Sequence, residues 1–200
     1  LSGIGLVMGS SNQIIENDVS DNQYNIAVFT SNLSLVARNK ESYARGSSFS
    51  LGDSPNSYIT VADERIQHST YSSFVVRNSS FVTIKNVSVI NTSYSSAYDF
   101  EALAPANYLL FTDYLFGSYN IPNEISGARF KNTGNGEIDF LKNISASGGN
   151  LTADIRIKFN LVDVNSAQRP GLNKSANITL EGLSQNFANA VILRNGQPCP

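Results

Sequence analysis

The feature that most constrains the fold is a repeated pattern of short apolar runs interrupted by serine and asparagine. The segment Ser79–Asn91 (SSFVTIKNVSVIN) aligns with Ser10–Asn22 (SSNQIIENDVSDN), sharing two serines, one isoleucine and two asparagines. In this alignment Ile15 corresponds to Ile84, a shift of 69 positions that is close to three steps of about 23 residues. An apolar repeat of this length is typical of a β-solenoid, in which each coil stacks on the next.

Each unit of the repeat contains a short apolar run, a turn, a second short run and a bend. Such strands are too short to form a stable hairpin sheet alone, whereas stacked coils pair each strand with its counterparts about 4.8 Å above and below. We therefore predict an all-β fold, a right-handed parallel β-helix (solenoid) over residues 1–165. The side chains expected to face inward are Ile4, Leu6, Ile15, Ile26, Val28, Ile59, Val82 and Ile84.

Beyond this helix we predict a short C-terminal β segment over residues 166–200, the start of a truncated β module. It follows the proline- and glycine-containing connection Ser166–Gly171. Because the sequence begins at Leu1 without a leader pattern and stops in the turn Gly196–Pro200, we expect it to be a segment of a longer protein. No apolar run within it is long enough to span a bilayer as a helix.

Asn17 and Asn86 occupy the bend in the two aligned copies. Asparagine adopts the left-handed backbone conformation more readily than most residues, and its amide can donate and accept hydrogen bonds between coils. We therefore predict that Asn17 and Asn86 belong to one structural asparagine ladder along the stack. Because a ladder amide cannot also carry a glycan, we expect the sequon Asn86-Val87-Ser88 to remain unmodified.

The charge balance and the sequons point to an extracellular protein without a nucleic-acid partner. Fourteen Lys and Arg residues stand against 16 Asp and Glu, for a formal charge of −2, which is unlike the basic surface of a nucleic-acid binder. Asn-X-Ser/Thr sequons are frequent, and those expected in turns or connections are the glycosylation candidates Asn32, Asn78 and Asn173. These features predict an extracellular or cell-surface location.

Several segments resemble known β-helix families. GIGLVMGSSNQIIENDVSDNQYNIAV, at residues 3–28, resembles the parallel β-helix repeats of NosD-type proteins, and SSFVTIKNVSVINT, at residues 79–92, is similar to the pectin-lyase-like repeat. NLVDVNSAQRPGLNKSANITLEGL and the later ILRNGQPCP resemble the tail of β-helix surface proteins predicted in archaeal genomes. The resemblance implies a non-catalytic spacer, adhesin or carbohydrate-binding surface that contacts extracellular polysaccharide. The alternative that it implies is a polysaccharide lyase or glycoside hydrolase of the pectin-lyase-like superfamily.

The candidate catalytic residues are the carboxylates Asp99, Glu101 and Asp113. Asp99 and Glu101 lie two apart and would share a face of an extended strand, so with Asp113 they have the residue types of a glycosidase pair or a calcium site. No motif fixes their geometry, and we expect a solvated loop without catalytic residues. The tyrosines nearby are predicted to offer stacking surfaces for sugars: Tyr94, Tyr98, Tyr108, Tyr114 and Tyr119.

Neither a metal site nor a hydrolase motif is complete in this sequence. The NosD-type resemblance suggests copper, but the chain has one His (His68), one Met (Met8) and one Cys (Cys199). Copper sites need several such ligands together, so we expect no metal and no cofactor. Arg156-Ile157-Lys158 resembles the Arg-Ile-Lys motif of polygalacturonase-like hydrolases, but the Asn-Thr-Asp, Asp-Asp and His-Gly motifs that accompany it there do not occur. The non-catalytic interpretation is therefore preferred.

Overall fold

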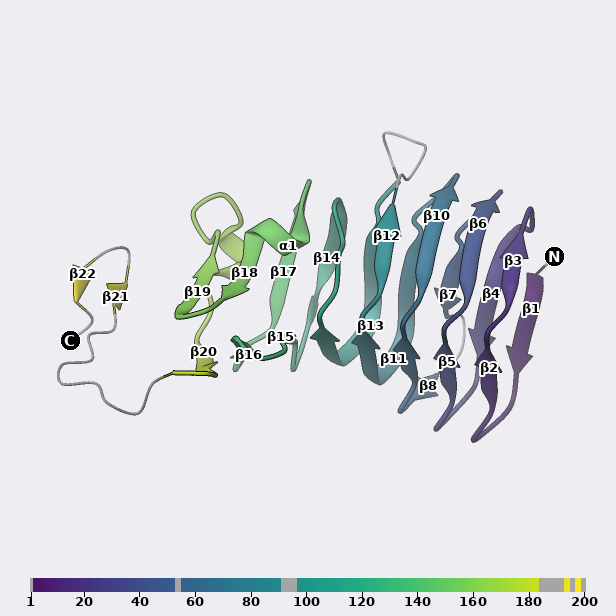
Figure 1. The fold of residues 1–200 in the computed structure, drawn as a ribbon, viewed down its shortest axis with the longest axis horizontal. Helices are drawn as coiled ribbons and strands as arrows, with labels where there is room; N and C mark the ends of the chain where they lie inside the picture. The colour runs from purple at the N-terminus through teal and green to yellow at the C-terminus, as the bar shows by residue number, and fades with distance from the viewer. Residues whose placement is uncertain (1, 53–54, 91–96, 184–192, 195–196, 199–200) are drawn as a thin grey trace.

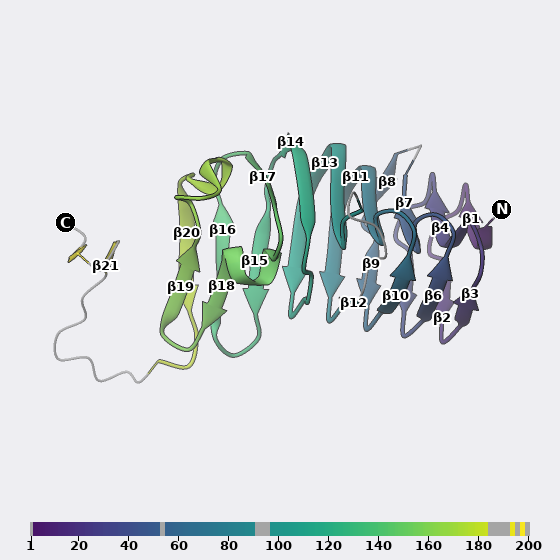
Figure 2. The ribbon, with the colours of Figure 1, turned by 90° about the horizontal axis from the view of Figure 1, so that it is seen from above.

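The computed structural model describes residues 2–52, 55–90, 97–183, 193–194 and 197–198. About 60% of the chain is in strands, and its parallel coils form a β-solenoid of about five turns. The coils stack along the long axis of the molecule, with strands of successive coils lying side by side in both views (Figures 1 and 2). The predicted parallel β-helix is confirmed.

The strands of the solenoid form three parallel rows. The first row contains β1 (Ser2–Val7), β4 (Tyr24–Phe29) and β7 (Phe49–Leu51), followed by β11 (Phe74–Lys85) and β13 (Phe100–Thr112). The second row contains β2 (Gln13–Ile15), β5 (Leu35–Ala37) and β9 (Thr60–Ala62), with the short β8 (Asn56–Ser57) before it. The long strands β11 and β13 continue into this row. The third row is β3 (Asp18–Ser20), β6 (Lys40–Ala44), β10 (Arg65–Ser69) and β12 (Ser88–Ile90).

Parallel pairing ends with β14 (Tyr119–Ile125) and β15 (Arg129–Asn132), which both pair with β13. From residue 136 onward the pairing is antiparallel, which places this change inside the range 1–165 that the sequence assigned to the parallel helix. The domain boundary itself stays a prediction. The remaining elements are β16 (Gly136–Phe140), β17 (Ile144–Gly148), α1 (Leu151–Asp154), β18 (Ile155–Lys158), β19 (Leu161–Val164), a 3₁₀ turn at Pro170–Leu172, β20 (Ala176–Leu180), β21 (Leu193–Arg194) and β22 (Gln197–Pro198).

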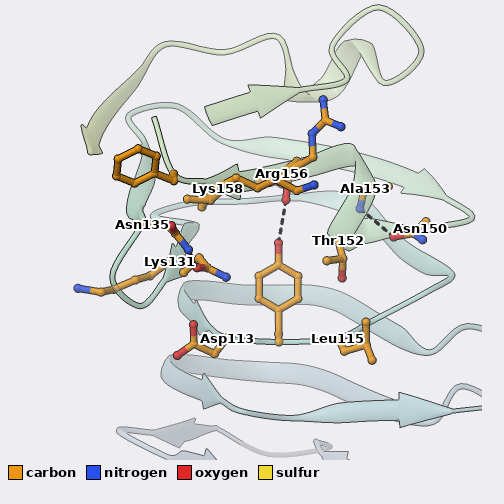
Figure 3. A pocket seen from close by; sticks show the side chains of 14 residues that line it. Asp113, Leu115, Lys131, Asn135, Asn150, Thr152, Ala153, Arg156 and Lys158 are labelled. Atoms are coloured by element: carbon orange, nitrogen blue, oxygen red, sulfur yellow. Dashed lines mark hydrogen bonds between the residues drawn. The ribbon is translucent and has the colours of Figure 1, made fainter. Parts of the chain in front are cut away.

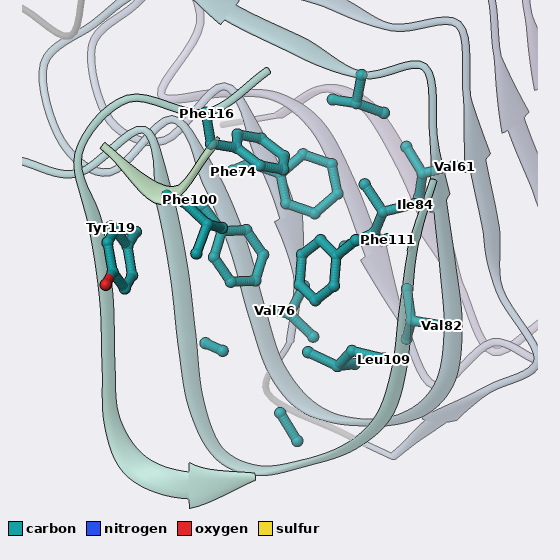
Figure 4. Packing of buried hydrophobic residues seen from close by; sticks show 14 of the residues in the cluster. Val61, Phe74, Val76, Val82, Ile84, Phe100, Leu109, Phe111, Phe116 and Tyr119 are labelled. Atoms are coloured by element: carbon teal, nitrogen blue, oxygen red, sulfur yellow. The ribbon is translucent and has the colours of Figure 1, made fainter. Parts of the chain in front are cut away.

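The core is an apolar column that becomes aromatic toward the fifth coil. Phe74, Phe100, Phe111 and Phe116 are fully buried and pack ring against ring (Figure 4), with centroids 5.1 to 6.4 Å apart. Among the predicted inward residues, those at 0% exposure are Ile26, Val28, Ile59, Val82 and Ile84, whereas Ile4 and Leu6 are partly buried against the core.

The predicted equivalence of Ile15 and Ile84 is wrong by one residue. In the second row Ile14 aligns with Val36, Val36 with Val61, and Val61 with Ile84. Ile15 aligns instead through Ala37 and Ala62 with Lys85, and is only half-buried. Because neighbouring residues of a strand point to opposite faces, a slip of one position exchanges inward and outward residues.

The same slip affects the predicted asparagine ladder. The ladder is real but consists of Asn17, Asn39 and Glu64: Asn39 Oδ1 accepts hydrogen bonds of 2.9 Å from both Asn17 N and Asn17 Nδ2. Glu64 Oε1 in turn accepts from Asn39 Nδ2 at 2.9 Å and Asn39 N at 3.3 Å. Asn86 is not a member, since it lies exposed at the neighbouring position and donates to Asp63 Oδ1 at 2.8 Å. Asn86 does adopt the left-handed backbone, with φ of 51°, but Asn17 is not among the residues with positive φ.

The exposure of Asn86 reverses the expectation for its glycosylation. When the chain is secreted from a glycosylating host, we expect a glycan at Asn86 as well as at the exposed Asn32 and Asn173, because no ladder bond holds the Asn86 amide inside. Asn78 is half-buried and should be occupied less fully. Glycopeptide mass spectrometry measures this, with Asn86→Gln as the control, and a bare Asn86 beside a fully occupied Asn32 would contradict it.

The coils turn at corners that use left-handed backbone without glycine. Apart from Asn160, every described non-glycine residue with positive φ lies at a coil corner, and successive coils carry such residues at equivalent positions. The four corner columns that result are Met8, Thr30 and Asn78; Ser11, Leu33, Tyr58, Phe81 and Tyr108; Glu16, Arg38, Asp63, Asn86 and Asp113; and Asp21, Tyr43 and His68. The corner position thus accepts apolar, polar, charged and aromatic side chains alike.

Candidate functional site

The structure does not bring the three candidate carboxylates together. Asp99 is 8% exposed, and its Oδ2 accepts a hydrogen bond of 2.9 Å from Gly117 N. Glu101 lies on the outer surface of β13, where its Oε1 accepts from Asn120 Nδ2 at 2.9 Å. Asp113 is at a corner on another side of the coil, where its two carboxylate oxygens accept from Thr133 N and Thr133 Oγ1. The expected shared face of Asp99 and Glu101 is therefore wrong, because Asp99 is turned into the protein.

A polar groove of about 400 Å³ lies beside Glu101 and crosses several coils; we call it the first-row groove. Its floor carries Ser50, Val75 and Glu101, which stand in register on β7, β11 and β13. Since each of these residues comes from a different coil, the groove runs along the stacking axis. Its lining residues are Gln23, Tyr24, Gly46, Ser47, Ser50, Gly52, Tyr71, Ser72, Val75, Arg77, Ala97 and Glu101.

One wall of the groove is built from the connections between the third and first rows. Gly46 is necessary there because a Cβ at this position would lie 2.4 Å from the backbone oxygen of Gln23. In the next coil Tyr71 donates its backbone N–H to Gly46 O at 3.2 Å, which fixes the tyrosine at the rim. Tyr71 is 63% exposed, and in the part of the chain that the structure describes its ring stacks on no other aromatic ring. A ring face is therefore accessible beside polar side chains.

The tyrosines predicted to offer sugar-stacking surfaces are mostly turned inward. Tyr119 is fully buried and donates its hydroxyl to Asp154 Oδ2 at 2.9 Å. Burial raises the pKa of the Tyr114 hydroxyl, which lies against Ile155 O at 3.4 Å. Tyr98 is half-buried, Tyr108 is 52% exposed, and Tyr94 lies outside the described residues. The sequence thus pointed to the correct residue type but missed Tyr71, which follows a polar stretch and has no pattern around it.

A second cavity, of about 580 Å³, lies between the last parallel coil and β18 (Figure 3). Asp113 and Leu115 lie on one side of it and Arg156 and Lys158 on the other. Several of its polar groups already have partners within the chain. Asn150 Oδ1 accepts from Ala153 N, Thr152 Oγ1 bonds to Phe116 O, and Lys131 Nζ lies 2.8 Å from Glu181 Oε1. The first of these hydrogen bonds caps α1, and the other two contacts join the coil to the antiparallel segment. Because these polar groups are already paired, the cavity is less suited to a polar ligand than the first-row groove.

Two carboxylic acids inside the solenoid were not predicted from the sequence. Glu41 on β6 stands in register between Val19 and Ile66, is 0% exposed, and neither of its carboxyl oxygens has a hydrogen-bond partner among the described residues. Burial raises the pKa of Glu41 well above its ordinary value, and the charge of Glu64 raises it further. The neutral form of the Glu41 carboxyl is therefore favoured inside the coil.

Glu64 is the second of these acids and ends the asparagine ladder. Burial raises its pKa to about 7, although the hydrogen bonds from Asn39 oppose the shift. Its Oε2 lacks a hydrogen-bond partner within the described chain.

The sequence around Glu41 does not indicate that this residue is buried. The stretch Lys40-Glu41-Ser42 has the composition of a polar surface, and only the register with Val19 and Ile66 reveals that Glu41 points inward.

The described residues contain no group of three or more His, Cys, Asp or Glu side chains placed to hold a metal ion. Within the same residues, no helix has both the length and the apolar character needed to cross a membrane. Comparison of the chain with protein-family models, with curated proteins and with solved structures found no match.

Proposed function

We propose that this chain is a non-catalytic, extracellular or cell-surface β-helix module that binds polysaccharide in the first-row groove. The observation that carries the proposal is the exposed Tyr71 ring at the rim of a groove lined by serine, glutamine, arginine and glutamate side chains. Sugar recognition commonly combines an apolar ring face with a few polar groups that fix orientation. The exposed sequons Asn32, Asn86 and Asn173 support the extracellular part of the proposal.

The direction of the groove favours a linear polymer over a small ligand. Ser50, Val75 and Glu101 repeat across three successive coils, which are about 4.8 Å apart in a β-sheet. A chain lying in the groove would therefore meet an equivalent strand position at each coil. Binding along several coils adds contacts with length, so oligosaccharides should bind more weakly than the polymer.

The placement of the carboxylates supports binding rather than hydrolysis. Glycoside hydrolases position two carboxyl groups about 5–5.5 Å apart when they retain configuration, and about 6.5–9.5 Å apart when they invert it. Glu101 is the single carboxylate among the described residues that line the groove, while Asp99 is buried and Asp113 lines the other cavity. The alternative of a glycoside hydrolase is therefore the less favoured function, whereas a polysaccharide lyase is tested separately by the release of unsaturated products.

Replacing Tyr71 tests the proposal. Tyr71→Ala is expected to weaken binding to polysaccharide at least about tenfold, because it removes an exposed aromatic ring from the rim of the groove. Affinity electrophoresis through gels containing acidic or neutral polysaccharides measures this, followed by calorimetry on the polymer that binds. The matched control is Tyr43→Ala at another corner, where a tyrosine of 59% exposure stacks on His68 at 5.0 Å and lines no part of the groove.

Two results would overturn this function. If the wild-type chain binds none of the polymers, or if Tyr71→Ala and Tyr43→Ala weaken binding equally, the groove is not the binding site. If incubation with the same panel releases reducing ends or unsaturated products, the chain is an enzyme. Loss of that release in Glu101→Gln would then place the catalytic group in the groove.

A further inference from the structure

The cavity between the last parallel coil and β18 differs in character from the first-row groove. Its surface is more apolar than polar, whereas the surface of the groove is more polar than apolar. Tyr114 and Leu115 line the cavity from the connection after β13, and Ile155 and Ile157 line it from β18. Its volume of about 580 Å³ lies in the range of about 300–1,000 Å³ that is usual for small-molecule sites. The cavity is therefore suited to a ligand with an apolar body.

Two of the apolar side chains that line the cavity are exposed to solvent. Phe159 lies in the two-residue connection between β18 and β19 and is 61% exposed. Leu115, which Figure 3 shows on the coil side, is 53% exposed. A ligand in contact with both side chains removes their apolar surface from water, which favours binding.

The position of β18 beside the coil is fixed by contacts that need no ligand. Ile155 and Ile157 are 2% and 8% exposed and belong to the apolar core. Asp154, the residue before β18, accepts hydrogen bonds of 2.9 Å from Tyr119 Oη and Arg169 Nε. The cavity is thus formed in the free chain, so binding does not require a segment to be ordered first.

The cationic side chains that line the cavity differ in whether they already have a counter-ion. Lys131 Nζ lies 2.8 Å from Glu181 Oε1, and Arg156 pairs with Asp163 on β19. Neither of these two acids lines the cavity. Lys158 also lines it, is exposed, and forms no ion pair within the described part of the chain. An anionic group of a ligand would therefore find an available partner in Lys158.

We propose that the cavity binds an amphipathic carboxylate, with its apolar body against Leu115 and Phe159 and its carboxylate at Lys158. A hydrogen bond from an ammonium group to a carboxylate is stronger than a neutral one, and apolar surroundings strengthen it further. The single carboxylate among the described lining residues, Asp113, already accepts hydrogen bonds from Thr133 N and Thr133 Oγ1. No described residue lines both this cavity and the first-row groove, so the inference is independent of polysaccharide binding.

Three probes separate the two parts of the proposed ligand. Octanoate has the apolar chain and the charge, octan-1-ol has the chain alone, and acetate has the charge alone. In calorimetry on the wild-type chain, octanoate should bind at least about tenfold more tightly than octan-1-ol, because its contact with Lys158 is charge-assisted. Acetate should not bind, because it has no apolar body to cover the lining.

Variants of the lining test each contact separately. Lys158→Gln should reduce the affinity for octanoate to that for octan-1-ol, whereas Phe159→Ala should weaken both by at least about threefold. Both residues are exposed, so neither change removes core packing. The matched controls are Lys85→Gln and Phe81→Ala, which make the same changes at exposed residues of β11 outside the cavity and should leave both affinities unchanged.

NMR spectra of methyl-labelled protein place the site without relying on variants. Octanoate should shift the methyl signals of Leu115 and Ile157, and should leave unchanged those of Leu141, which is 55% exposed and does not line the cavity. The proposal is overturned if octanoate does not bind, if octan-1-ol binds as tightly as octanoate, or if Lys158→Gln behaves like Lys85→Gln. Equal shifts at Leu141 and Leu115 overturn it as well, since they indicate binding to any exposed apolar side chain.

Discussion

Raising the pH from about 4.5 to about 7 is expected to lower the free energy of unfolding by about 3 kcal/mol through Glu64 alone. The folded pKa of Glu64 is about 7, whereas the unfolded chain releases this proton near 4.5. Between these values the folded state binds more protons than the unfolded state, so stability falls as protons are withdrawn. The contribution is complete below 4.5 and is lost as the pH passes the folded pKa. Glu41, whose pKa is also raised by burial, contributes to the loss in the same direction.

The cause of this loss is the burial of both acids inside the coil. Glu41 has no hydrogen-bond partner among the described residues, and Glu64 is coupled to Asn39, to the charge of Asp63 and to Glu41 itself. Ionising either acid leaves a buried charge that no salt bridge within the described residues balances, which costs several kcal/mol unless the coil opens to water. At low pH a different carboxylate, Asp154, determines how stability depends on pH. Burial raises the pKa of Asp154, but hydrogen bonds from Asn165, Arg169 and Tyr119 outweigh it and lower the pKa overall, so its stabilisation is lost only as the pH falls below about 3.8.

Urea unfolding at a series of pH values between 4.5 and 9 measures the effect. Glu41→Gln should flatten the decline and increase stability at the alkaline end, because an amide of the same shape does not ionise. Glu64→Gln should flatten the part of the decline below pH 7. Glu16→Gln is the control: Glu16 is exposed and pairs with Arg38 at 2.9 Å on the surface, where such pairs contribute little. A decline that persists unchanged in both Glu41→Gln and Glu64→Gln would contradict the assignment.

The largest effect of a single core substitution is expected at Phe111. Its ring meets Phe100 edge to face at 5.1 Å (Figure 4). It also stacks on Phe130 at 4.6 Å, so it joins the parallel coils to the segment where antiparallel pairing begins. Phe111→Ala removes these contacts and leaves a cavity, and comparable changes in protein cores cost about 3–5 kcal/mol. That is a large part of the 5–15 kcal/mol by which domains are usually stable.

Chemical denaturation of Phe111→Ala and Phe159→Ala separates core packing from the loss of any aromatic ring. Phe159 is 61% exposed in the hairpin, and its removal should change stability by less than about 0.5 kcal/mol. Phe111→Leu keeps much of the volume and should recover part of the loss. Equal destabilisation by Phe111→Ala and Phe159→Ala would show that the aromatic cluster is not the main support of the last coils.

The architecture followed from the sequence because a coil of 22 to 25 residues leaves a repeating mark at every turn. The register did not follow, because the step between coils varies: it is 22 from Gln13 to Leu35, 25 from Leu35 to Thr60 and 23 from Thr60 to Thr83. A uniform period placed Ile84 opposite Ile15 when its true counterpart is Ile14. Since strand side chains alternate between faces, this error of one position in the alignment assigned the exposed Asn86 to the buried asparagine ladder.

The candidate site was less predictable than the fold for a related reason. The sequence shows residue types, but whether Asp99, Glu101 and Asp113 meet depends on which way each strand faces and on which side of the coil it lies. Glu101 lines the groove, Asp99 turns inward to Gly117, and Asp113 sits at a corner. Tyr71 and the stacking of Tyr58 on Phe81 depend on the alignment of connections and corners, which no local pattern encodes.

The left-handed corners affect which amino-acid substitutions the solenoid tolerates during evolution. In L-residues this backbone conformation costs about 1–2 kcal/mol, yet here methionine, leucine, glutamate, arginine, tyrosine, histidine and phenylalanine all adopt it. The strain is met by the hydrogen bonds between coils, so it does not depend on which side chain is present. A corner side chain can therefore be substituted while the backbone keeps its conformation. Because the corners repeat once per coil, such substitutions change the side chains exposed on the surface at regular positions along the solenoid.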